Sequence, residues 1–432
     1  MMTEPSESMK RLAQLIETGD ADGIRQLGRA DPNLRAELDN PLPGGHFGAT
    51  PLLTARSKGD VAVVDALLDI GANIDGRSHW WAGSFGVLDG DPKLAQHLIS
   101  RGATIDINAA AHLGLFDRVK ELLDADASLV HHRGGDGQTP LHVAAAVAIA
   151  DLLLDRGADI NARDVDHEST PAQYAIKDRV DVVRRLVERG SETDILLACA
   201  VGDIELVKTL IERDPQVVRT TVSEEWFPKK NPRSGGTIYI WTLGWNKSPQ
   251  QVAHAYGHAE IVQLLQERSP AEINLIDACI IGDRATMERL LAEYPDFKSS
   301  IAKNVYHRIV GLAMDRNIKG VRLLLEMGCP PDAAGSDGVT ALHWAAFHGD
   351  VELTQLLLKA GAPIDIVERS FNARPLGWAT HGSLHGWYAK SGDYTGVVKL
   401  LLDAGAVPQS ALKDSDASPA VMQILRNYRK NS

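Results

Sequence analysis

The chain has 432 residues, 44% of them apolar and 24% charged, which is the composition of a folded protein rather than a disordered one. A net charge of −12 argues against nucleic acid or an anionic membrane as the main partner, because both require a basic surface. The three cysteines, Cys199, Cys279 and Cys329, are too few and too widely spaced for a disulfide framework or a cysteine-rich zinc site. Since Met1–Lys10 lacks the apolar stretch of a signal peptide and no apolar run would span a membrane, we expect a cytoplasmic protein.

Two short signals alternate along the chain. The first is Thr-Pro-Leu-His at residues 139–142, which returns as Thr-Ala-Leu-His at 340–343; Thr caps a helix and Pro fits its first turn. The second is a leucine pair followed three residues later by Gly, which predicts the end of a second helix. Weaker copies of the first signal begin at Thr50, Thr170, Ser248 and Arg374, and leucine pairs precede Gly71, Gly157, Gly328 and Gly361.

This alternation resembles the ankyrin repeat over nearly the whole chain. The clearest copy covers residues 337–370, where the turn, the helix pair and the terminating Gly are all in register. The resemblance implies an all-α, ankyrin-type solenoid of helix–turn–helix units with short finger hairpins, and we count about twelve units. Because a single unit cannot bury its apolar face alone, we expect one cooperative solenoid over residues 1–432.

The predicted organisation follows the chain from a capping unit at each end to two insertions within the array. Three units are short and lack a finger, which either opens a groove or reflects duplication of a drifted pair; they cover 105–126, 194–214 and 273–294. The predicted segments are the divergent N-terminal unit 9–44, repeats 45–218, insertion 219–247, repeats 248–413 with insertion 383–392, and the C-terminal cap 414–432.

The tryptophans gather in fingers, insertions and one repeated position. Trp344 and Trp378 occupy the same position of adjacent repeats and should form an aromatic ladder near the concave face. Aromatic side chains in long loops on a rigid scaffold favour a binding surface; the weaker alternative is that they fill small cores inside the insertions. Within the first insertion, residues 237–243 alternate and are β-branched, which predicts a hairpin strand. The remaining tryptophans are Trp80, Trp81, Trp226, Trp241, Trp245 and Trp387.

The sequence shows little metal or cofactor chemistry. His254 and His258 lie four residues apart, as zinc ligands on a helix do, but Ala255 stands where the metalloprotease motif needs Glu. His258 also fits the repeat, so we predict no metal site. There is no Gly-rich phosphate loop or nucleophile elbow, and we expect no cofactor; Gly134–Gly137 is assigned to the turn of a finger.

One group of residues supports catalysis. Carboxylates, histidines and tryptophans of the fingers and insertions are the ingredients of a carbohydrate site, in which two carboxylates act as acid and base. The same charged side chains are typical of any solvated loop, and the sequence assigns no catalytic residue. The candidates are Asp166, Glu168, Glu224, Glu225, Glu368, His46, His79, His131, His132, His381 and His385.

Two functions compete. The resemblance implies a protein–protein interaction scaffold that holds a partner on its concave face, fingers and insertions, and the acidic charge favours a partner with a basic segment. The alternative is a small-molecule or saccharide-binding protein, or a hydrolase or isomerase, whose pocket is closed by the insertions. The predicted binding residues are Trp80, Trp81, Trp226, Tyr239, Trp241, Trp245, Trp344, Trp378, His381, His385 and Trp387.

Overall fold

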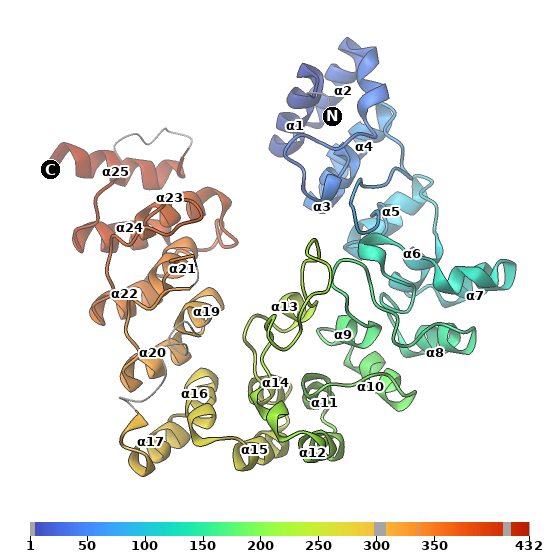
Figure 1. Cartoon of the computed structure of the whole chain (residues 1–432). Helices are drawn as coiled ribbons and strands as arrows, with labels where there is room; N and C mark the ends of the chain where they lie inside the picture. Colours follow the sequence, from blue (N-terminus) through green and yellow to red (C-terminus); the bar gives the residue numbers. More distant parts are fainter. Residues whose placement is uncertain (1–4, 298–307, 336, 409–415, 432) are drawn as a thin grey trace. The chain divides into compact units, whose positions relative to one another are not determined.

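A computed structural model describes residues 5–297, 308–335, 337–408 and 416–431 (Figure 1). By its internal contacts the chain divides into two compact units. The N-terminal unit comprises Met1–Leu206 and Val222–Trp245, and the C-terminal unit comprises Val207–Thr221 and Asn246–Ser432. The first division falls within α12 (Ile204–Arg213), and most of the predicted insertion 219–247 belongs to the N-terminal unit.

The N-terminal unit is built from short helices joined by turns and by several longer loops. Its α-helices are α1 (Glu7–Thr18), α2 (Ala21–Ala30), α3 (Pro51–Lys58), α4 (Val61–Asp69), α5 (Ala95–Ser100), α6 (Ile107–His112), α7 (Phe116–Ala125), α8 (Val147–Asp155), α9 (Pro171–Ala175), α10 (Val180–Glu188), α11 (Ile195–Val201) and α13 (Tyr239–Thr242). Short 3₁₀ segments are found at Pro32–Glu37, His46–Gly48, Pro92–Leu94, Ala127–His131 and Gly135–Gly137.

The C-terminal unit repeats the same helix pair. After a 3₁₀ turn at Pro215–Arg219, its α-helices are α14 (Pro249–Ala255), α15 (Ala259–Arg268), α16 (Ala271–Ile281), α17 (Arg284–Glu293), α19 (Arg308–Met314), α20 (Ile318–Met327), α21 (Ala341–Phe347), α22 (Val351–Lys359), α23 (Pro375–His385), α24 (Tyr394–Asp403) and α25 (Pro419–Asn431). First helices contact first helices in the order α19, α21, α23, and second helices contact second helices in the order α20, α22, α24, α25 (Figure 1). This is the packing of a helical solenoid.

The two sequence signals explain the helix boundaries. The side chain of Thr50 accepts a hydrogen bond from the backbone of Leu53, and α3 starts at Pro51, as the first signal predicts. In the second helix of each pair, the first leucine of the Leu pair is buried and the second is half-buried. The terminating glycines have φ values between 85° and 107°, in the left-handed region that an L side chain rarely adopts, at Gly71, Gly157, Gly328 and Gly361. The predicted all-α repeat fold is therefore confirmed.

The histidines of the first signal tie neighbouring repeats together. The Nδ1 atom of His142 accepts the Thr139 amide proton at 3.1 Å, so Nε2 carries the imidazole proton and donates it to the Ser169 carbonyl. His343 makes the same bond to Thr340, and its Nε2 atom faces the Ala373 carbonyl. Each imidazole thus bridges the start of one repeat to the finger of the next.

One predicted helix does not form. Residues 139–146, which carry the Thr-Pro-Leu-His signal, make only a turn before α8, although the same signal starts α21. The distance in sequence from Thr139 to its terminating Gly157 is three residues shorter than that from Thr340 to Gly361, which leaves no room for a full helix. The guanidinium of Arg179 donates to the carbonyls of residues 142 and 144 and so satisfies part of this turn.

The hairpin strand predicted at 237–243 is also wrong. This segment forms the short helix α13, and its Tyr239 ring is fully buried against Phe227. The Tyr239 hydroxyl donates to Asp194 at 2.8 Å, which fixes the helix on the repeats. In the described part of the chain, the one isolated β-bridge pairs Ala334 with Thr340, and no helix is long and apolar enough to cross a lipid bilayer.

Candidate functional site

An open groove of about 550 Å3 lies in the C-terminal unit. Its walls come from α21, α23, the finger before α23 and the second predicted insertion. The residues that line it are Trp344, Phe347, Phe371, Ala373, Gly377, Trp378, Thr380, His381, His385, Trp387 and Asp416.

Three tryptophans form the apolar surface of this groove. Trp344 and Trp378 lie edge to face with ring centroids 5.2 Å apart, so the predicted contact between the two repeat positions is confirmed. Trp387, from the insertion, stacks on Trp344 at 5.6 Å. Phe347 lies edge-on to all three rings. Such pairs add about 0.5–1.5 kcal/mol each beyond the area they bury.

The insertion 383–392 is held in place by the repeats. Tyr388 lies under the guanidinium of Arg316 at 4.6 Å and edge-on to His348. Arg316 in turn donates to Asp350 at 2.9 Å. Because these contacts fix the loop that carries Trp387, that ring is oriented before any ligand arrives.

The groove exposes large aromatic surface. Trp387 is 65% exposed and Phe371 is 77% exposed. The imidazoles of His381 and His385 lie 4.8 Å apart at its edge, and burial, together with the neighbouring His385, lowers the pKa of His381. An exposed apolar patch beside polar groups is typical of an interaction site.

In the N-terminal unit, the first insertion is hydrogen-bonded to the finger at residues 164–169. The amides of Lys230 and Asn231 both donate to the Glu168 carboxylate at 2.7 Å, and the amide of Ile238 donates to the Ser169 hydroxyl. The backbone of Gly235 donates to the carbonyl of Asp166 at 2.9 Å. Glu168, a predicted candidate for acid–base chemistry, thus holds the insertion in place by accepting two backbone hydrogen bonds.

The region where the first insertion contacts the finger at 164–169 also brings two carboxylates and an imidazole together. Trp80 donates its indole N–H to Asp136 at 3.0 Å, and His167 lies with its Nε2 atom 3.5 Å from an oxygen of Asp166. One oxygen or nitrogen atom from each of Asp136, Asp166 and His167 lies within 4.8 Å of the others. Burial raises the pKa of Asp136 to about 6.

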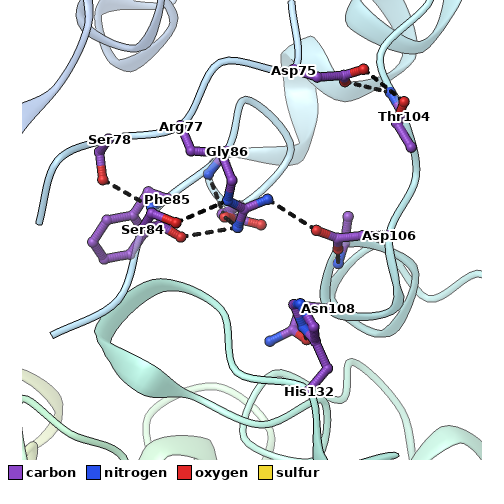
Figure 2. A network of polar contacts seen from close by, with 12 residues as sticks. Asp75, Arg77, Ser78, Ser84, Phe85, Gly86, Thr104, Asp106, Asn108 and His132 are labelled. Carbon is purple, nitrogen blue, oxygen red and sulfur yellow. Dashed lines mark hydrogen bonds and ion pairs between the residues drawn. The ribbon is translucent and has the colours of Figure 1, made fainter. Parts of the chain in front are cut away.

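A polar network supports the finger that carries Trp80 and Trp81 (Figure 2). The Arg77 guanidinium donates to the hydroxyl and carbonyl of Ser84 and to the carboxylates of Asp106 and Asp89. Asp75 accepts from the amide and hydroxyl of Thr104 in the same view. The N–H groups of the Arg77 guanidinium already donate to acceptors within the protein, so we interpret this network as structural. It borders a hollow of about 240 Å3.

The other predicted binding residues are dispersed. Trp80 contacts Trp81, and Trp81 lies under the guanidinium of Arg233 at 4.4 Å. Trp226 lines a separate hollow of about 250 Å3 in the N-terminal unit. Trp241 is 67% exposed and Trp245 is 43% exposed. Tyr239 is buried in the insertion, so it serves as a core residue there and its ring is closed to a ligand.

The predicted carboxylates do not assemble into a catalytic pair in the described groove. Glu368 is buried and accepts hydrogen bonds from the amides of residues 370, 371 and 373, which makes it a turn brace. Glu224 pairs with Lys229 within the first insertion.

Sequence reasoning missed several residues of both regions. Phe347 follows Trp344 by three residues on the same helix, and that spacing places both side chains on one face. Phe371 and Asp136 carry no comparable signal, because each lies in a turn of ordinary composition.

Comparison with known proteins identifies the class to which these helical repeats belong. Family models match ankyrin repeats (3 copies) at residues 107–197, ankyrin repeats (many copies) at 311–358 and an ankyrin repeat at 47–79. Ankyrin repeats are thus detected at three positions of the chain, as the sequence predicts.

Curated relatives match over limited regions. The chain is 31% identical to rat (Rattus norvegicus) ankyrin repeat and SAM domain-containing protein 6 over 27% of this chain and 14% of that protein. It is 34% identical to Drosophila melanogaster palmitoyltransferase Hip14 over 24% of this chain and 14% of that protein. It is 24% identical to ankyrin repeat domain-containing protein SAT10 of Stachybotrys chartarum over 74% of this chain and 17% of that protein. The chain therefore spans less than a fifth of the length of these relatives.

Among solved structures, the chain is similar to the human ASB11 ankyrin repeat domain. The sequence identity is 19% and the TM-score is 0.28, and the match covers 70% of this chain and 99% of that one.

Proposed function

We propose that this protein is a binding scaffold that holds a segment of a partner protein in the aromatic groove of its C-terminal unit. Ankyrin repeats generally bind protein partners. The observation that supports this site is the exposed Trp387 ring stacked on Trp344 at the mouth of an open groove. Tryptophans on a fixed scaffold are typical of the few residues that dominate binding energy.

The chemistry of the groove suggests the kind of segment it takes. Its lining includes three tryptophans and two phenylalanines, which suit a bulky apolar or aromatic side chain. The net charge of −12 favours basic residues on either side of that anchor, because complementary charge raises association rate and specificity. We therefore propose a partner segment with a large apolar residue flanked by Lys or Arg.

The groove suits a scaffold better than an enzyme. It is only partly enclosed, and Glu368, a predicted acid–base candidate in this unit, accepts hydrogen bonds from the backbone of its own turn. A saccharide that stacks on Trp387 is the remaining alternative, and a glycan array screened alongside peptides tests it directly.

The experiment is a displayed random-peptide selection on the intact protein, followed by affinity measurement with Trp387→Ala. Because the Trp387 ring is largely exposed, its removal should leave the fold intact, and circular dichroism checks this. We expect selected peptides to share an aromatic or large aliphatic residue near basic residues, and Trp387→Ala to weaken them at least about tenfold.

The matched control is Tyr294→Ala, an exposed aromatic of the same unit that stacks on Phe297 away from the groove. It should leave peptide affinity unchanged. Peptides that bind Trp387→Ala as tightly as the native protein would show that the groove is not the binding site. Binding of glycans in place of peptides would show that the ligand is a saccharide and not a protein segment.

A further inference from the structure

The contact region of the N-terminal unit joins two fingers and the first insertion at one point. The amides of Val165 and Asp166 donate to the carbonyl of Asp136, which ties the finger at 164–169 to the turn at 135–137. The insertion then closes over the finger through the amide of Gly235. Three side chains, Asp136, Asp166 and His167, meet where these segments touch.

Each of the three side chains is oriented by a hydrogen bond to a residue outside the cluster. The Trp80 indole holds one oxygen of Asp136 at 3.0 Å, and the Gly235 amide holds one oxygen of Asp166 at 3.2 Å. The Nδ1 atom of His167 lies 2.8 Å from the Gly236 carbonyl. Outer hydrogen bonds of this kind are characteristic of metal ligands, because they fix the tautomer and the direction of the ligating atom.

The imidazole of His167 provides an independent indication. A carbonyl oxygen only accepts hydrogen bonds, so the bond to Gly236 places the proton of a neutral ring on Nδ1. The remaining nitrogen, Nε2, then presents a lone pair to the Asp166 carboxylate 3.5 Å away. The His167 side chain is only 10% exposed and that of Asp166 only 8%, so bulk water has little access to this contact. In that tautomer the Nε2 atom and the Asp166 carboxylate are both free to act as ligands to one cation.

The backbone of the insertion passes close to these side chains at Gly235. A Cβ atom added at Gly235 would lie 3.1 Å from the His167 ring and 3.3 Å from Asp166, so glycine lets the backbone cover the site without filling it. Three ligand atoms that share one ion with bonds of about 2.1 Å lie about 3.4 to 3.6 Å from one another. The 3.5 Å between the Nε2 atom of His167 and the carboxylate of Asp166 already fits this spacing, and Asp136, whose ligand atom lies within 4.8 Å of both, would have to move inward.

We propose that Asp136, Asp166 and His167 bind one divalent transition-metal ion that fastens the first insertion to the two fingers. One imidazole nitrogen and two carboxylate oxygens suit Zn²⁺ or Mn²⁺, whereas Ca²⁺ prefers a set of six to eight oxygen ligands. Water would complete the coordination. The ion would join Asp136 of one repeat to Asp166 and His167 of the next, and through the latter two to Gly235 and Gly236 of the insertion.

The test is calorimetric titration of the EDTA-treated full chain with ZnCl₂ and, separately, MnCl₂. We expect one equivalent of one of these ions to bind and to raise the thermal midpoint. Asp136→Asn, which keeps the acceptor for Trp80, and His167→Ala should each lower that affinity at least about tenfold. Gly235→Ala should lower it as well without removing a ligand, which keeps the proposal testable if a ligand variant folds poorly.

The matched control is His97→Ala, because His97 also faces a carboxylate, that of Asp65, at 2.9 Å in the same unit. It should bind metal like the native chain. The ion should also slow trypsin cleavage after Lys229 and Lys230, where the amide of Lys230 is bonded to Glu168.

Two results would overturn the proposal. One is an adventitious ion only, seen as affinity and stoichiometry that are the same in the native chain, His167→Ala and His97→Ala. The other is an absence of binding with both ions, together with ¹⁵N shifts that show His167 protonated on both nitrogens at pH 7. In that case the site is an ion pair between His167 and Asp166.

Discussion

At the residue scale, buried histidines make stability depend on pH. His142 is fully buried, and desolvation lowers its pKa to about 3. Burial also lowers the pKa of His343 and of His348. A histidine that stays neutral in the fold takes up its proton only on unfolding, so acid favours the unfolded chain.

The sign of the effect follows from the two pKa values of His142. Below an unfolded value near 6.5 the unfolded state binds more protons, so the stability from the neutral ring is present above about pH 6.5 and is lost as pH falls toward 3. The loss is about 1.4 kcal/mol per pH unit, or about 2 kcal/mol between pH 7 and pH 5.

We expect His142→Gln to reduce the difference in unfolding free energy between pH 7 and pH 5 by about 2 kcal/mol, as measured by urea denaturation. Buried carboxyls with raised pKa values, such as Asp194 and Asp277, act in the opposite sense, and the comparison of variant with native chain removes their contribution. An unchanged difference would show that His142 is not held neutral.

Sequence reasoning located residues well where the repeat fixes their place. Trp344 and Trp378 meet because repeat register brings equivalent positions of stacked helices together. It misjudged Tyr239, because the alternation around this residue is equally compatible with a short helix that buries one face. It passed over Asp136, whose partner Trp80 is 56 residues away, so nothing in the local turn Gly134–Gly137 signals the contact.

At the scale of elements, close packing of α21 on α23 depends on a missing side chain. A Cβ atom at Gly382 would overlap the carbonyl oxygen of Phe347 and crowd Tyr394 at 3.0 Å. A backbone carbonyl cannot rotate aside as a flexible side chain does. The groove between Trp344 and Trp378 therefore depends on this glycine.

We expect Gly382→Ala to lower the free energy of unfolding by about 1–3 kcal/mol, because the two helices must separate. Gly311→Ala is the control, since a Cβ there meets nothing within 4 Å on helix α19. That change should be neutral or stabilising by up to about 1 kcal/mol. Thermal unfolding of both variants measures the two changes in stability. Equal changes would mean that helix propensity alone, and not the contact with the Phe347 carbonyl, determines the effect at Gly382.

Helix positions were predictable where the chain had room for the full unit. The signals at Thr50, Thr170 and Ser248 start helices α3, α9 and α14 at the next residue. The copy at Thr139 fails because its unit is three residues short, a deletion visible in the sequence once the repeats are aligned. The role of Arg179 in closing that turn depends on a contact that spacing cannot show.

At the scale of the whole molecule, repeats transmit stability mainly to their neighbours. We expect Gly382→Ala to increase amide hydrogen exchange in α19 to α25 and to leave α1 to α10 at native protection. Mass spectrometry of peptides from the intact chain measures this. Faster exchange throughout would instead support the predicted single cooperative solenoid over residues 1–432.

The division of the chain bears on how the protein can be dissected. The backbone passes from one unit to the other at residue 206, again at 221 and again at 245, so the N-terminal unit is discontinuous in sequence. A fragment that stops at residue 206 would lose Lys230 and Asn231, the amide donors to Glu168, and with them Gly235 and Gly236. Truncation between repeats, the usual way to shorten such arrays, would thus remove residues 222–245 from the N-terminal unit that the fragment is meant to represent. A fragment that contains the whole N-terminal unit would need residues 222–245 joined to residue 206 by a new linker.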